Sequence, residues 1–161
     1  YILKAIEAKN PSKDFCLISV GRGHTQKDVE QLASKLGVDG KVRFLGQRTD
    51  VPKLLNAMDM FFLPSLFEGF PIVAIEAQTA GLPLVIADTI SKEVELTNLV
   101  HWLPIDKGAE VWAEKYYQIA HTKVNRVQYA PIVERKGFDA RHSAQILQDI
   151  YVKNILRNEN S

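Results

Sequence analysis

The sequence predicts an α/β fold: a Rossmann-like parallel sheet flanked by helices, with the chain ending in helices. Two observations support the fold class. Short apolar, β-branched or aromatic runs alternate with longer segments of helical period, which is typical of parallel strands joined by helical crossovers. The length of 161 residues also fits one domain with a proper core, and no internal repeat or long linker divides it.

The first half of the chain begins this alternation. Residues 1–9 have helical spacing, and 14–20 (DFCLISV) is an apolar run that predicts a strand. A helix is expected over 25–36, because Gly37 is a typical helix stop. The next strand is expected over 41–45, where VRFL is the apolar part.

The middle of the chain continues it with shorter elements. Asp50 can cap a helix, VPKLLNAM, whose Pro52 falls in the first turn where a missing N–H does no harm. The strand MFFLP (60–64) follows, and Pro71 begins the next helix. The run PLVIA (83–87) predicts another strand.

The last third of the chain changes to mostly helical patterns. A weaker strand is expected over 99–104. After it, KGAEVWAEKYYQIAH and FDARHSAQILQDIYVKNIL place apolar residues at helical spacing. We expect these segments to be helices that cover the sheet, with the basic pair Arg135 and Lys136 on a solvated face.

Composition excludes several function classes. Twenty basic and nineteen acidic residues give a net charge of +1, which does not predict a nucleic-acid partner. The four histidines lack metal-ligand spacing, so no metal site is expected. Cys16 lies in an apolar run and is predicted to be a core residue without a disulfide. No apolar run approaches the roughly 18 residues of a membrane span, so we expect a soluble domain.

Two glutamates stand out in the apolar stretch PSLFEGFPIVAIEAQTAG, residues 64–81. Ligands of parallel α/β sheets bind at the carboxyl ends of the strands, and Glu68 follows such an end. The helix that begins near Pro71 offers free N–H groups to a phosphate, and Gly69 allows close approach. Glu76 leans back toward that helix start, and its apolar neighbours predict that it is buried and needs a hydroxyl donor.

Carboxylates that accept from hydroxyls, beside a helix start that binds phosphate, together fit a nucleotide sugar. A plainer reading makes Glu68 a solvated loop acid and pairs Glu76 with a neighbouring backbone group or Lys. Gly21-Arg22-Gly23 after a strand suggests a dinucleotide fingerprint, but the third glycine is missing. Arg22 and Arg48 are each open to two readings, a ligand contact or an exposed loop arginine.

The stretch PSLFEGFPIVAIEA resembles the Glu-x7-Glu motif of retaining GT-B glycosyltransferases, particularly the family called group 1 or family four. Four other blocks are similar to the family's in the same order: LISVGRG, LGVDGKVRFLGQRTDV, AMDMFFLPS and GLPLVIAD. The closing KGFDARHSAQILQDIY resembles bacterial members that build capsular or exopolysaccharides.

The resemblance implies that residues 1–161 are a donor-binding domain for UDP-sugar or GDP-sugar, truncated at its N-terminal edge and lacking its acceptor domain. Glu68 would be the catalytic residue that contacts the donor sugar, and Glu76 would hold the ribose. The other donor-binding residues would be Gly69, Phe70, Ile72, Gly21, Arg22, Gly23 and Arg48. Transfer would retain the anomeric configuration and need neither a metal nor a cofactor, since cationic groups and a helix start neutralise the diphosphate.

Two departures from the family pattern matter. The Arg and Lys that usually contact the diphosphate would lie upstream of the first residue, so this piece alone is expected to be inactive. Ile90 and Ser91 stand where many relatives have a Gly-Gly pair, which leaves the phosphate contacts of that loop open.

Two alternatives to a glycosyltransferase remain at this stage: a GT-B nucleotide-sugar epimerase, and a binding module that kept the fold but lost catalysis. The family implies a glycan or lipid-linked acceptor, a cytoplasmic location and a place near the inner membrane face. The sequence does not identify the sugar, the base or the acceptor.

Overall fold

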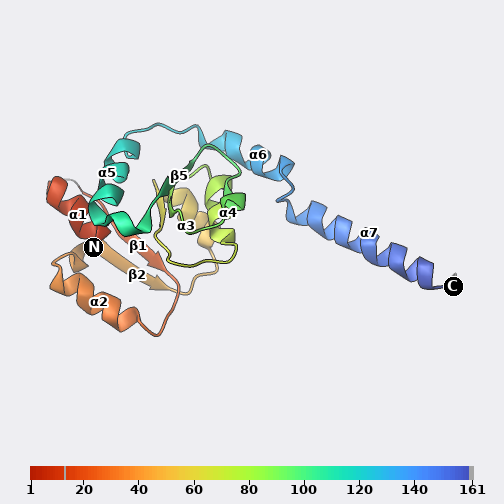
Figure 1. Cartoon of the computed structure of the whole chain (residues 1–161), viewed down its shortest axis with the longest axis horizontal. Helices are drawn as coiled ribbons and strands as arrows, with labels where there is room; N and C mark the ends of the chain where they lie inside the picture. Colours follow the sequence, from red (N-terminus) through yellow and green to blue (C-terminus); the bar gives the residue numbers. More distant parts are fainter. Residues whose placement is uncertain (13, 160–161) are drawn as a thin grey trace.

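A computed structural model describes residues 1–12 and 14–159, and its strands all run parallel (Figure 1). Strand β1 (Leu17–Val20) pairs with β2 (Val42–Gly46), and β3 (Phe61–Leu63), β4 (Leu84–Ala87) and β5 (Val100–Leu103) form a second sheet with β4 in the centre. The predicted α/β class is confirmed. The described strands form two parallel sheets, one of two strands and one of three, where the sequence pattern predicts one.

Helices connect and flank the strands much as expected. They are α1 (Ile2–Lys9), α2 (Gln26–Lys35), α3 (Val51–Ala57), α4 (Ile72–Thr79), α5 (Ala109–Ile119), α6 (Tyr129–Arg135) and α7 (Ala140–Glu159). Helix α1 packs against α5, where the Tyr117 hydroxyl donates to the Ile6 carbonyl at 2.7 Å. Helix α4 packs against α6. The predicted helices and strands occur in the predicted order, and α6 is a helix that the sequence analysis did not predict.

The main core surrounds β4. All four residues of this strand are fully buried, since β3 and β5 pair with its two edges and helices cover its faces. Gln78 of α4 is also fully buried. Its amide donates to the Val94 carbonyl at 2.7 Å and accepts from the N–H groups of Leu96 and Thr97, both at 2.9 Å. These bonds fix α4 to the segment before β5, which matters because α4 carries Glu76.

The structure corrects two of the local expectations and confirms a third. Cys16 is exposed and not in the core, because it precedes β1 and no described element covers it. Asp50 does precede α3, but its carboxylate binds Arg48 and does not cap the helix. Pro52 does lie in the first turn of α3.

Helix α7 does not cover the sheet. It projects away from the rest of the molecule (Figure 1), and its apolar side chains are exposed, among them Leu147, Ile150 and Tyr151. A helical spacing of apolar residues predicts that a helix has an apolar face, but it does not say which element packs against that face. Of the helices in the described residues, none is long and apolar enough to cross a membrane.

Candidate functional site

The candidate site lies at the carboxyl ends of the strands, where the chain leaves β3 and enters α4. Residues 64–71 make this connection, and the loop after β4 lies beside it: the Thr89 hydroxyl donates to the Ser65 carbonyl at 2.8 Å. Because the strands are parallel, both loops emerge at the same edge of the three-stranded sheet.

Glu68 is half-buried in the β3–α4 loop. The Ser65 hydroxyl donates to its Oε1 atom at 2.9 Å, a charge-assisted bond that restricts the carboxylate. Ser65 is in turn held by Thr89 through its backbone carbonyl. The second carboxylate oxygen of Glu68 has no partner among the described residues and can accept from a ligand hydroxyl.

Glu76 lies in the second turn of α4 and is exposed, so the predicted burial is wrong. Its apolar neighbours Ala74, Ile75 and Ala77 face the core, whereas Ile72, Glu76 and Thr79 share the exposed face at spacings of four and three residues. Within the described chain no side chain pairs with Glu76. Its carboxylate therefore keeps both oxygens for hydroxyl donors at no desolvation cost in the free protein.

The start of α4 combines two features that suit an anion. No side chain caps its first turn, and that turn contains no acidic residue, so its N–H groups and the positive end of its dipole are uncompensated. Gly69, in the loop three residues before the first residue of α4, is exposed, and a Cβ there would meet open space.

Two apolar side chains flank this helix start. Ile72 is 58% exposed, and Phe70 stacks on Phe138 with ring centroids 6.0 Å apart and planes 5° apart. The stack joins the loop before α4 to the segment that precedes α7, a contact between residues far apart in sequence.

The glycine loop after β1 belongs to the two-stranded sheet. The Gly21 N–H donates to the Gly46 carbonyl at 2.8 Å, which links the loops after β1 and β2. Gly21 has a φ of 126° and Gly46 a φ of 63°, left-handed values that favour glycine. Arg22 is exposed, and its Nε atom lies 3.7 Å from where a Cβ of Gly46 would be. Gly23 is also exposed.

Arg48 is engaged by an acidic neighbour. Its Nε and Nη2 atoms donate to the two carboxylate oxygens of Asp50, both at 2.8 Å. These hydrogen bonds hold the pKa of Asp50 below its usual value and raise the pKa of Arg48. The positive charge of Arg48 is therefore neutralised by Asp50. The Arg22 guanidinium, by contrast, forms no ion pair within the described residues.

Sequence reasoning missed Ser65 and Thr89 as supports of Glu68. Ser65 precedes Glu68 by three residues, a spacing at which a hydroxyl can reach a carboxylate, and this signal was available in the sequence. Thr89 could have been placed at the same sheet edge from the strand pattern. Ile90 is buried, and Ser91 accepts from the Glu93 N–H at 3.3 Å to begin a short 3-10 turn. Both residues thus have structural positions in the loop after β4.

Metal ligands do not gather at this edge. Over residues 1–12 and 14–159, no group of three His, Cys, Asp or Glu side chains is placed to hold a metal ion.

Comparison with known proteins identifies a family. Residues 1–128 match the family model described as "Glycosyl transferases group 1". The chain is 31% identical to the EpsF protein of Bacillus subtilis (strain 168) over 154 residues, which cover 94% of this chain and 40% of EpsF.

Solved structures agree with this match. The crystal structure of WaaG, a glycosyltransferase involved in lipopolysaccharide biosynthesis, superposes with a TM-score of 0.71 at 25% identity over 88% of this chain and 39% of that one. Anabaena HepE in complex with UDP gives 0.69 at 24% identity, covering 94% of this chain and 44% of HepE. The chain spans about two fifths of the length of these relatives, and it belongs to the group 1 family of glycosyl transferases.

Proposed function

We propose that this chain is the nucleotide-sugar binding domain of a retaining glycosyltransferase. One observation carries the proposal: an uncapped helix start, that of α4, lies between two carboxylates with oxygens free to accept, Glu68 before it and Glu76 within it. Phosphate suits the helix start and sugar hydroxyls suit the carboxylates. Membership of the group 1 family supports the proposal, as does the UDP bound to HepE.

In this proposal the donor lies along the start of α4. Its diphosphate contacts the first N–H groups of α4 beside Gly69, and Glu76 accepts from the two ribose hydroxyls. Glu68 is the catalytic residue, which contacts the donor sugar while Ser65 orients its carboxylate. As the bond to the sugar breaks, negative charge grows on the leaving diphosphate, and preorganised N–H groups stabilise it without a metal.

The base would lie toward the two-stranded sheet. The linked loops after β1 and β2 bring Gly21, Gly23 and Arg48 to that side. Arg22 is the cation we assign to a phosphate contact, because its guanidinium has no competing carboxylate. Arg48, held by Asp50, would contribute a planar surface and hydrogen bonds more than net charge.

Calorimetric titration of UDP, GDP and several UDP-sugars into the chain tests the donor site. Glu76→Ala should weaken binding by about ten- to a hundredfold, because it removes charge-assisted bonds to hydroxyls. Glu30→Ala is a matched control, since Glu30 is also exposed and also lies four residues after the start of its helix, α2. It should leave the affinity unchanged.

Two results would contradict the donor site. Equal losses for the two alanine variants would show that Glu76 has no special role. A folded chain that binds no nucleotide, even when extended upstream along the full-length protein, would leave only the fold and favour a non-catalytic module.

We further propose that the full-length protein transfers its sugar to a glycan or lipid-linked acceptor at the cytoplasmic face of a membrane. The proposal rests on the family and on WaaG, which is named for lipopolysaccharide biosynthesis. The chain alone should transfer no sugar, which an assay with radiolabelled donor would check. Exchange at C2 of the donor sugar, without transfer, would instead indicate an epimerase.

A further inference from the structure

A groove opens at the end of the three-stranded sheet opposite the proposed donor site. Its volume is about 470 Å³, within the range of small-molecule sites. Pro83 and Leu99, which immediately precede β4 and β5, form part of its lining, together with α5 and the connection from α5 to α6. Since Glu68 follows the carboxyl end of β3, this groove is separate from the proposed donor site.

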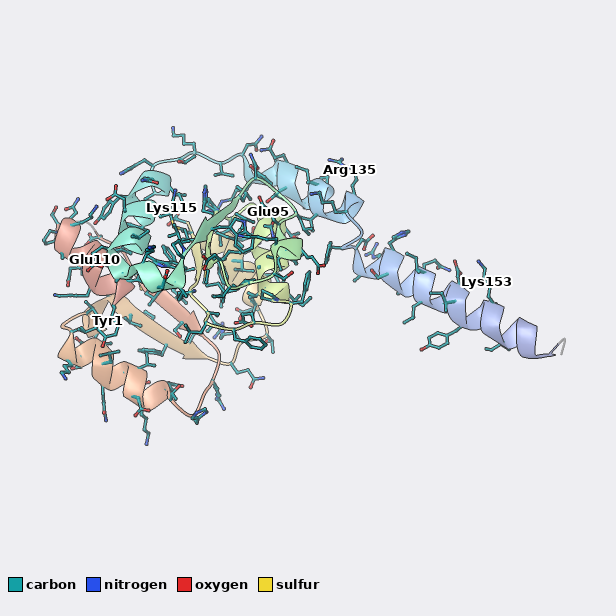
Figure 2. The ribbon with its side chains drawn as sticks, viewed as in Figure 1. Tyr1, Glu95, Glu110, Lys115, Arg135 and Lys153 are labelled. Atoms are coloured by element: carbon teal, nitrogen blue, oxygen red, sulfur yellow. The ribbon has the colours of Figure 1, made fainter. Side chains whose placement is uncertain are left out.

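The charges in this groove have one sign. Lys115 and Lys123 supply them, His101 lies beside them, and among the described residues in the lining there is no carboxylate. Lys115, labelled on α5 in Figure 2, is half-buried, and neither lysine forms an ion pair within the described chain. Positive charge concentrated in a concave surface raises the local concentration of anions.

The groove also has an apolar and a hydrogen-bonding part. Ile119 and Tyr129 are buried side chains in its lining, and the Tyr129 hydroxyl donates to Asn98 at 3.1 Å, which orients the Asn98 amide. Gln118, Thr122 and Asn125 contribute further polar groups. A bare inorganic anion would use the lysines alone, whereas a ligand with an apolar part would use both kinds of lining.

We propose that this groove binds a phosphate ester that carries an apolar group, with Lys115 and Lys123 contacting the phosphate. The basic groups supply charge-assisted donors, and the apolar lining next to them accepts the ester's body. The proposal is independent of the donor site, because it uses none of the residues assigned there. Such an ester could be free in solution or the headgroup of a lipid, and the test separates these sources.

The test is titration of the chain with hexyl phosphate, followed by the NMR shifts of His101, Lys115 and Tyr129. We expect saturable shifts with a dissociation constant of about 1 mM or below, and weaker binding of inorganic phosphate. The double variant Lys115→Gln, Lys123→Gln should weaken binding about tenfold or more. Lys27→Gln, Lys35→Gln is the matched control, because it removes two exposed lysines from α2 and should bind like the parent.

Two further arms complete the test. Lys115→Arg, Lys123→Arg keeps both charges and should restore binding, so a loss through misfolding is told apart from a loss of charge. Sedimentation with phosphatidylglycerol vesicles, against phosphatidylcholine vesicles, separates a lipid headgroup from a free ester: lysine-dependent sedimentation with the anionic vesicles identifies the headgroup. The proposal is overturned if hexyl phosphate causes no shift at the three residues, or if both glutamine variants lose affinity equally.

Discussion

The two sheets of this domain are packed to very different degrees. Around β4 a continuous core is closed on both faces, and all four residues of that strand have no exposed surface. Around β1 and β2 the buried cluster consists of Ala33, Val38 and Val42, and the ends of β1, Leu17 and Val20, are exposed. The proposed site draws on both sides. Its two glutamates extend from the well-packed sheet, whereas Arg22 and Arg48 extend from the thinly packed one.

From this difference we infer that the two sheets have different tasks in the proposed site. A carboxylate that must meet specific hydroxyls benefits from a fixed position, and α4 is fixed by the buried Gln78. A loop that accepts a base tolerates more movement, because sparsely packed regions open at lower free energy. The predictions that follow test this contrast between the two sheets.

The largest contrast is expected at two glycines. Gly81, after α4, has a φ of 65°, and a Cβ there would lie 2.6 Å from the Arg126 Cα atom. Gly37, after α2, has a φ of 71°, but a Cβ would meet open space. Gly81→Ala should lower the free energy of unfolding by about 3–5 kcal/mol, from backbone strain plus the clash. Gly37→Ala should cost only the strain, about 1–2 kcal/mol.

Urea unfolding of the two glycine variants measures these costs. Equal losses of unfolding free energy would show that the residues around Gly81 move aside for the added methyl group at no further cost. That result would contradict the proposed contrast between the two sheets.

A matched pair of valines sharpens the comparison. Val85 in β4 is fully buried, and Val42 in β2 is 8% exposed, within the smaller cluster. Val85→Ala should cost about 2–3 kcal/mol of unfolding free energy, from lost burial plus a cavity that its packed neighbours cannot fill. Val42→Ala should cost about 1 kcal/mol, because its surroundings can relax. Thermal or urea unfolding measures both costs. A larger loss of unfolding free energy for Val42→Ala than for Val85→Ala would contradict the conclusion that the three-stranded sheet is the better packed.

The smallest effects concern pH, and each sheet contributes one group. His101 lies on β5, where burial and then the charge of Lys115 lower its pKa below the ordinary 6.5. The other groups near it are Lys123 and Tyr129, which line the same groove, and Val85, its partner on β4. Folding therefore favours neutral His101, and stability should fall as pH drops from 6.5 through the lowered value. NMR titration should give a midpoint below 6.5, and a midpoint above it would contradict this assignment.

On the side of the two-stranded sheet, Asp50, between β2 and α3, has a pKa lowered first by its hydrogen bond from Arg48. Its contribution is present above the ordinary value of 3.8 and is lost as pH falls through the lowered one. Because the pair is exposed, Arg48→Ala should barely change stability at neutral pH but should return the Asp50 midpoint toward 3.8. An unchanged midpoint in the variant would show that Arg48 is not the cause.

Strand and helix positions could be predicted because they depend on local periodicity. The run LVIA is apolar throughout and became the fully buried β4, and Pro71 stands directly before the helix it was expected to begin. Exposure was harder to predict, since it depends on which element lies opposite. Cys16 and α7 are exposed for that reason, and Glu76 is exposed because it falls on the one open face of α4.

The supports of the site could be predicted only in part. The strand pattern places Ser65 and Thr89 at the same sheet edge, but a local pattern does not say which distant groups bond or stack, as in the Thr89–Ser65 bond and the Phe70–Phe138 stack. The family could be predicted because five blocks occur in the right order along the chain. The roles of Glu68, Glu76 and the donor-binding residues stay predictions until nucleotide binding is measured.

The Phe70–Phe138 stack gives α7 a mechanical relation to the start of α4. With 20 residues, α7 is about 30 Å long, and Phe138 lies at its base, directly after Gly137 with a φ of 89°. A rotation of about 10° at this point would move the far end by about 5 Å over that length, while the rings at the base would shift far less. The stack therefore lies at the end of α7 where such a rotation produces the smallest displacement, next to the loop that contains Glu68.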